Sequence, residues 1–121
     1  TALWWSAFLG TTELLRTLVT KDPQSLEMKA RRDGMSALQV SVREQRFDAT
    51  VILLENGADV NSVNRFGETA LMIAAGSGYA AAVELLCQCG ADVNIVDRFG
   101  EPALLKAAEQ NHIDVVSYLS N

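Results

Sequence analysis

The 121-residue sequence has no apolar run near the roughly 20 residues that a membrane-spanning helix needs. It also lacks a surplus of basic residues, since its net charge at pH 7 is -5. Nucleic acids and anionic membranes attract basic surfaces, so we expect neither nucleic-acid binding nor membrane insertion. The apolar stretch at positions 2–10 has no basic residue before it, which argues against a signal peptide. Because the chain begins with Thr1 and not with Met, we expect it to be a segment of a longer protein.

Residues that commonly build catalytic or metal sites are scarce. The chain has one histidine, His112, and two cysteines, Cys87 and Cys89, which are too close together for an ordinary disulfide and lack the second ligand pair of a zinc site. The sequence contains no G-x-S-x-G, phosphate-binding glycine loop or H-E-x-x-H motif. We therefore expect no enzymatic activity, no metal and no cofactor. Two cysteines without an evident bridge indicate a reducing compartment, the cytoplasm or the nucleus.

What the sequence does contain is an internal repeat. The tetrapeptide RFGE occupies positions 65–68 and recurs 33 positions later, at 98–101. The same shift aligns GADVN at 57–61 with GADVN at 90–94, and it places Gly34, Gly67 and Gly100 in one column. A period of this length is typical of structural units that stack on one another.

Each unit predicts a loop followed by two helices. A polar loop containing glycine precedes the apolar stretch 69–78, and a second helical stretch covers 80–90. In the second stretch Val83, Leu86 and Cys87 recur at i, i+3 and i+4, which is one face of a helix. Two short helices cannot bury their apolar faces alone, whereas stacked neighbours can, so the pattern indicates a solenoid.

The ends of the predicted helices carry suitable residues. Ser36 and Thr69 stand where an N-cap would begin the first helix of a unit. Pro102 occupies the next equivalent position and suits a first helical turn instead. Gly57 and Gly90 fall just past the second helix, where glycine readily adopts a positive φ.

These motifs resemble those of the ankyrin repeat family. The clearest unit, at 64–94, reads NRFGETALMIAAGSGYAAAVELLCQCGADVN; the unit before it ends LLENGADVN, and the unit after it begins DRFGEPALL. The resemblance covers the whole chain as one domain, 1–121, with approximate repeats at 1–29, 30–62, 63–95 and 96–121. It implies an all-α ankyrin-repeat solenoid of stacked helix-turn-helix units with projecting loops.

The sequence departs from the family at the tetrapeptide T-P-L-H. The corresponding residues are SALQ at 36–39, TALM at 69–72 and PALL at 102–105, so the histidine that ties the family's loop together is absent. Gln39 can partly replace it, whereas Met72 and Leu105 cannot. Either these loops are softer than usual or an apolar ladder stands in, and Trp4 in the same column favours the ladder.

The resemblance implies protein recognition through a concave face and a row of projecting loops. On the loops, Phe66 and Phe99 are either aromatic anchors for a partner or rings that pack on the neighbouring loop. On the concave face, small residues at 76 and 77 predict a hollow flanked by charged residues, with plain solvated surface as the alternative. The predicted contact residues are Arg32, Met35, Arg43, Glu44, Arg65, Phe66, Glu68, Gly76, Ser77, Arg98, Phe99, Glu101, Glu109 and Gln110.

Several other conspicuous residues are expected to be structural. We expect at least one of Trp4 and Trp5 in the core, since adjacent helical residues point about 100° apart. His112 stands in a column that begins a second helix of the family. Cys87 aligns with an apolar column and is expected in the core, and Cys89 is expected to be exposed.

The expected partner is another protein or peptide. Two alternatives stay open at this point: a regulatory ankyrin domain that docks on a catalytic or channel domain of the same parent chain, and a structural or self-associating scaffold.

Overall fold

The computed structural model describes residues 2–9, 11–21, 26–29 and 32–120, without the side chains of residues 2–4 and 6. These residues form eight α-helices: α1 (Ala2–Leu9), α2 (Thr12–Lys21), α3 (Ala37–Arg43), α4 (Phe47–Glu55), α5 (Ala70–Ser77), α6 (Ala80–Gln88), α7 (Ala103–Glu109) and α8 (Ile113–Ser120). Within the same described ranges there are two isolated bridges and no strand. The prediction of an all-α solenoid is confirmed.

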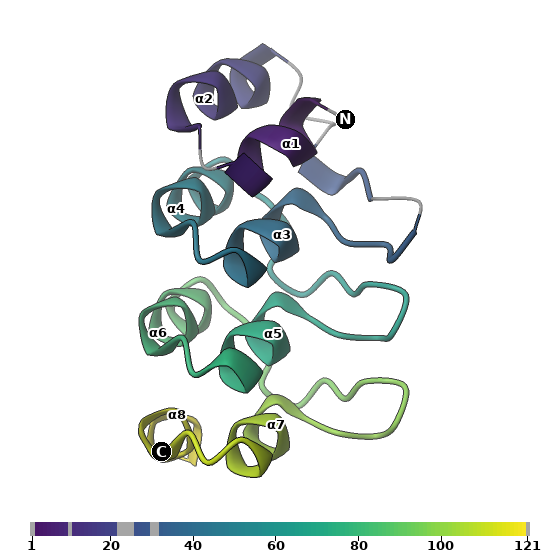
Figure 1. The fold of residues 1–121 in the computed structure, drawn as a ribbon, viewed down its shortest axis with the longest axis vertical. Coiled ribbons are helices and arrows are strands. Elements are labelled where there is room, and N and C mark those ends of the chain that lie inside the picture. Colours follow the sequence, from purple (N-terminus) through teal and green to yellow (C-terminus); the bar gives the residue numbers. More distant parts are fainter. Residues whose placement is uncertain (1, 10, 22–25, 30–31, 121) are drawn as a thin grey trace.

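The helices form two layers that run along the long axis of the molecule (Figure 1). One layer contains α1, α3, α5 and α7, and the other contains α2, α4, α6 and α8. Each predicted repeat contributes one helix to each layer. The loops that precede α5 and α7 project beyond the first layer on the side away from the second layer, as predicted (Figure 1). No helix in the described part of the chain is long and apolar enough to cross a membrane.

The core lies between the two layers. Leu38 and Leu71 from the first layer, with Ile52, Leu53 and Leu86 from the second, are at most 1 % exposed. Burying one such side chain stabilises a fold by roughly 1.5–3 kcal/mol, and no helix pair alone could bury both of its faces. Packing between successive repeats therefore adds to the stability that packing within each repeat provides.

The last described repeat leaves part of its apolar surface uncovered. Leu71 and Met72 of α5 are each 1 % exposed, because α7 packs against them. Leu104 and Leu105, in the same columns of α7, are 38 % and 41 % exposed. The predicted apolar ladder therefore holds at Met72 and does not extend to Leu105. The prediction for Trp4 concerns a side chain that lies outside the described residues.

Caps fix the start of the first helices. The Ser36 side chain accepts from the backbone of Gln39, whose side chain in turn accepts from the backbone of Ser36, so a complete capping box begins α3. Thr69 caps α5 through the backbone N–H of Met72. Pro102 takes the N-cap position of α7 with no side-chain bond, and the helix begins one residue later than we predicted. The reason is that its ψ of 170° is extended, as in the other two caps.

A close approach between successive loops explains the glycine at position 67. Gly67 has a φ of +77°, and a Cβ built on it would lie 2.9 Å from the backbone nitrogen of Arg98 in the next loop. Only glycine lets the two loop backbones approach this closely. Just past the second helices, Gly57 and Gly90 have φ of +90° and +93°, as predicted.

The predictions for Cys89 and His112 are confirmed, whereas the prediction of a tryptophan in the core is not tested, because the Trp4 side chain lies outside the described residues. Trp5 is 56 % exposed and meets Phe8 edge to face, so of the two tryptophans only Trp4 is left as the buried candidate. Cys87 is half-buried against the core, where burial raises the pKa of its thiol, and Cys89 is exposed; both are free thiols. His112 immediately precedes α8, as predicted for a helix start.

Candidate functional site

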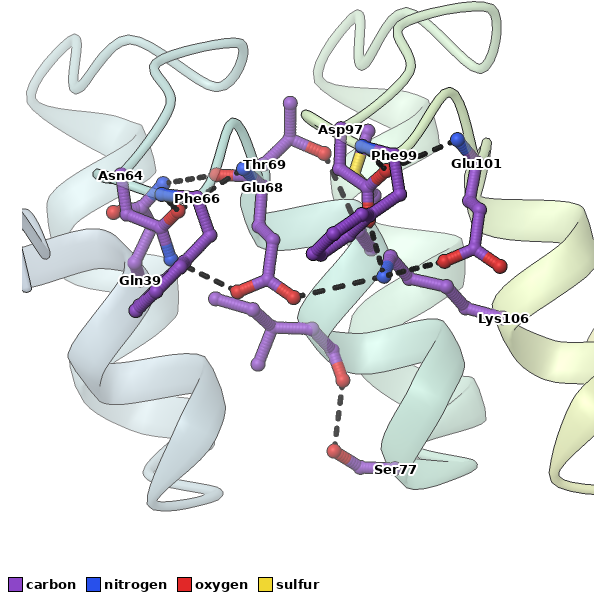
Figure 2. Close-up of polar contacts among 12 residues, drawn as sticks. Gln39, Asn64, Phe66, Glu68, Thr69, Ser77, Asp97, Phe99, Glu101 and Lys106 are labelled. Carbon is purple, nitrogen blue, oxygen red and sulfur yellow. Dashed lines mark hydrogen bonds and ion pairs between the residues drawn. The ribbon is translucent and has the colours of Figure 1, made fainter.

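The two RFGE loops are held by one repeated hydrogen-bond pattern. The Oδ1 atom of Asn64 accepts from the backbone N–H groups of Phe66 and Glu68, at 2.9 and 3.0 Å. In the next repeat the Oδ1 atom of Asp97 accepts from the equivalent groups at the same distances of 2.9 and 3.0 Å. Both residues are 7 % exposed, and Figure 2 shows them at the base of each loop. These turns direct the following phenylalanine outward.

Backbone hydrogen bonds tie the loops into a row. The N–H of Arg65 donates to the carbonyl of Asp33 at 2.9 Å, and the N–H of Arg98 donates to the carbonyl of Phe66 at 3.1 Å. The loops are therefore positioned by one another as well as by the helices beneath them. A surface fixed in this way loses little conformational freedom on binding.

Phe66 and Phe99 lie on the open side of this loop row. Phe66 is 43 % exposed and Phe99 is 71 % exposed. The guanidinium carbon of Arg98 lies 5.5 Å from the centre of the Phe66 ring and 5.1 Å from the centre of the Phe99 ring. The two rings are thus linked through a cation–π contact on each side of Arg98. Side chains from two repeats form one surface, as the spacing predicted.

Gln39 takes the structural place of the missing family histidine. Its Nε2 atom donates to the carbonyls of Ser62 and Glu68, at 2.9 and 2.8 Å. Its Oε1 atom accepts from the backbone N–H of Ser36 at 3.0 Å. The side chain is fully buried, so these bonds satisfy polar groups that water cannot reach. The predicted substitution of histidine by Gln39 is confirmed.

The loop before α7 is held by an ionic cluster that the sequence did not predict. The Nζ atom of Lys106 lies 2.7 Å from a carboxylate oxygen of Asp97, 3.6 Å from Glu68 and 4.0 Å from Glu101. Figure 2 shows the ammonium group among these three carboxylates. Lys106 stands in the column of Ile73, and Asp97 in the column of Asn64. The sequence signal for this ionic cluster was a paired difference between the two repeats. Asn64 and Ile73 of one repeat are replaced by Asp97 and Lys106 in the next.

The ionic cluster shifts the pKa of its members. The hydrogen bond from Lys106 lowers the pKa of Asp97, burial opposes that shift, and backbone hydrogen bonds add to it. Burial favours the neutral form of Lys106, yet its hydrogen bond and its attraction to Asp97 and the neighbouring carboxylates raise its pKa overall. A hydrogen bond with Glu109 raises the pKa of Glu101, and burial and repulsion from Glu109 contribute in the same direction.

A hollow of about 410 Å³ opens beside the loop row, on the face formed by α3, α5 and α7. We call this surface the concave face. Its floor and walls come from three consecutive repeats, with Gly76 at the middle. A Cβ built on Gly76 would find its nearest neighbour 4.0 Å away, at Lys106, so the missing side chain leaves open space. The residues that line the hollow are Asp33, Met35, Arg43, Asn64, Phe66, Glu68, Met72, Ile73, Gly76, Lys106, Glu109 and Gln110.

Several predicted contact residues meet in this hollow, and others do not. Arg43, Phe66, Glu68, Gly76, Glu109 and Gln110 line it. Ser77 is exposed outside it, and its hydroxyl donates to the carbonyl of Ile73 at 2.7 Å. Glu44 accepts from Arg43 at 3.1 Å and does not reach the hollow.

The remaining predicted contacts belong to the loops. Arg32 and Arg65 are exposed there, and Glu101 is half-buried beside Lys106. Met35 is only 3 % exposed, which contradicts its prediction as a projecting contact. Its sulfur accepts from Nδ2 of Asn64 at 3.3 Å, so the next loop covers it and it contributes to the floor of the hollow.

His112 supports the end of the concave face. Its Nε2 atom lies 3.1 Å from the carbonyl oxygen of Gly76, and its ring fills the space in which a side chain on Gly78 would lie. The histidine therefore joins the start of α8 to the end of α5. Within the described ranges, no group of three histidine, cysteine or carboxylate side chains could hold a metal ion.

Comparison with known proteins agrees with this architecture. A family model described as ankyrin repeats in three copies matches residues 1–64 and again residues 53–121. No curated protein matches the chain significantly. The two family matches together cover the chain from end to end, and the helix pairs, loop row and capped first helices agree with them. The chain therefore belongs to the ankyrin repeat family.

Proposed function

We propose that the chain binds a partner protein or peptide across its concave face and loop row. Ankyrin repeats are generally protein–protein interaction modules. The observation that supports the proposed surface most directly is the position of the exposed Phe66, which contacts Arg98 in the loop row and also lines the hollow. Aromatic and arginine side chains contribute disproportionately to binding energy at interfaces.

The geometry suits a partner that approaches along three repeats. The hollow accepts a protruding side chain, and the phenylalanines provide apolar area beside it. Because hydrogen bonds between the loops already fix this surface, the entropic cost of binding is small. The partner surface could belong to a separate protein or to another domain of a longer chain that contains this segment.

The test compares the wild-type chain with the double variant Phe66→Ala/Phe99→Ala. Immobilised wild-type protein is used to capture proteins from cell extract, and captured proteins are quantified by mass spectrometry. We expect a set of proteins that the wild type retains and that the double variant loses. The free energy of unfolding of the double variant should fall by at most about 2 kcal/mol, because Phe66 is 43 % and Phe99 71 % exposed.

Phe47 offers a matched control. It is 39 % exposed on α4, in the outer layer, so Phe47→Ala removes a similarly exposed ring far from the proposed surface. The control should retain the captured proteins. Equal capture by the wild type, the double variant and the control would contradict the proposed surface.

A further inference from the structure

The hollow has an apolar side and a charged rim. Phe66, Met72 and Ile73 provide apolar atoms, while Glu68 and Glu109 stand on its walls. A long side chain with an aliphatic stem and a charged end matches this arrangement, because its stem can pack while its head stays at the rim.

The two basic groups in the lining already have acidic partners. Arg43 lies 3.6 Å from a carboxylate oxygen of Asp33 and 3.1 Å from Glu44. Lys106 lies 2.7 Å from a carboxylate oxygen of Asp97. Neither cation is therefore available to attract an acidic partner.

The C-terminal side of the hollow has an excess of negative charge. Lys106 is surrounded by Glu68, Asp97 and Glu101, and Glu109 hydrogen bonds with Glu101. Three carboxylates thus share one ammonium group, and Glu109 adds a fourth carboxyl group beside Glu101. Among the described residues Glu109 forms no ion pair. The hydrogen bond with Glu109 is the main cause of the raised pKa of Glu101, followed by burial and by repulsion from Glu109 and Asp97. An incoming cation would relieve this repulsion.

The position of Glu109 is unfavourable for the fold itself. It is the last residue of α7, where the negative end of the helix dipole repels a carboxylate. It also faces another carboxyl group. A residue that conflicts with its local surroundings in two ways is a candidate for a functional role.

We infer that the hollow binds an arginine or lysine side chain of a basic peptide segment. Its aliphatic stem lies along Phe66 and Ile73, and its cationic group lies between Glu68 and Glu109. The net charge of -5 favours the approach of such a partner over long range. Arg98, whose guanidinium contacts the Phe66 ring, shows that this ring accepts a cation within the chain itself. This inference rests on the proposed function, since it specifies the partner of the same surface.

The test is a selection from a display library of random peptides of about 12 residues, a length that spans several repeats of a groove. Selected peptides are synthesised, and their affinities are measured by titration calorimetry. We expect each to contain an arginine or lysine whose replacement by alanine weakens binding roughly 10-fold. Affinity should also fall as the salt concentration rises from about 50 to about 300 mM.

Two glutamine variants separate the hollow from the rest of the surface. Glu109→Gln should weaken binding about 5-fold, which corresponds to one partly exposed charge pair. Its stability should not fall, because the glutamate is unfavourable at the helix end. Glu84→Gln, an exposed glutamate on α6 in the outer layer, should leave the affinity within about 2-fold of the wild type.

The outcomes distinguish this inference from the proposed function. Selected peptides without basic residues, or an affinity that Glu109→Gln leaves unchanged, would overturn the inference. If Phe66→Ala/Phe99→Ala still abolishes binding in that case, the proposed surface stands. Peptides that bind this double variant as well as the wild type, or a selection that yields no peptide sensitive to it, would overturn both.

Discussion

Replacing Lys106 with isoleucine should destabilise the fold by about 2 kcal/mol at neutral pH. The lysine is 17 % exposed, and the side chain of its closest partner, Asp97, is 2 % exposed. Removing one member of a fully buried pair typically costs about 3–5 kcal/mol, whereas an exposed pair contributes at most about 1 kcal/mol. The intermediate value follows because Asp97 keeps its two backbone N–H donors when the ammonium group is gone.

A second substitution should recover most of this loss. In the preceding repeat the same two columns hold Asn64 and Ile73, and Asn64 forms the same turn as Asp97. Asp97→Asn combined with Lys106→Ile therefore recreates a pattern that the fold already uses. Because the buried carboxylate disappears with its partner, the double variant should lie within about 1 kcal/mol of the wild type.

The cost of Lys106→Ile should depend on pH. The pKa of Asp97 is lowered in the folded chain, so its contribution is present above its unfolded pKa of about 4 and is lost as the pH falls through the lower folded value. The pKa of Lys106 is raised, so its contribution is complete below about pH 10 and is lost as the pH rises through the folded value. The destabilisation should therefore be largest between about pH 5 and 9 and should shrink in acid.

Urea unfolding of the wild type, both single variants and the double variant measures this coupling. Hydrogen exchange of the amides in α7 and α8 shows whether the loss is confined to the last repeat, since repeats unfold partly independently. A single variant Lys106→Ile that is as stable as the wild type at pH 7 would refute the reasoning. So would a double variant as unstable as the sum of the two single variants.

Four further substitutions test individual features of the fold and of the hollow. Gly78→Ala should cost at least about 2 kcal/mol in urea unfolding, because φ is +73° and the new Cβ would lie 2.5 Å from the His112 ring. Gly57→Ala, with φ of +90° and no atom within 4 Å, should cost only about 1 kcal/mol; equal losses would show that the ring contact is irrelevant. Gln39→Met should cost about 2–3 kcal/mol, since it removes the acceptor of the buried Ser36 N–H and the donor to the Ser62 carbonyl, and an unchanged unfolding midpoint would exclude that role. Gly76→Leu should fill the hollow and weaken binding of selected peptides at least about 10-fold without loss of stability, because leucine favours helix; retained affinity would place the binding surface elsewhere.

The solenoid could be predicted from the sequence because equivalent residues recur at a fixed interval. The cap residues Ser36 and Thr69 and the positive-φ glycine Gly57 act locally, so their roles could be read from position alone. The hollow followed from the small Gly76 in a column that faces the groove.

The ionic cluster could not be predicted in the same way. It forms because one loop, the next loop and α7 converge, and this convergence places Lys106 within reach of carboxylates from two repeats. Periodicity identifies equivalent positions within repeats but not contacts between different columns. The same limitation explains Met35, which is buried because Asn64 of the following loop covers it.

The most direct test of the central claim is amide chemical-shift mapping of a selected peptide on the isotopically labelled chain. The account predicts that the largest changes occur at Phe66, Gly76 and Glu109 and at their neighbours in the loop row, α5 and α7. Changes concentrated on the outer layer, in α4, α6 and α8, would contradict the claim that the concave face and the loop row form the recognition surface.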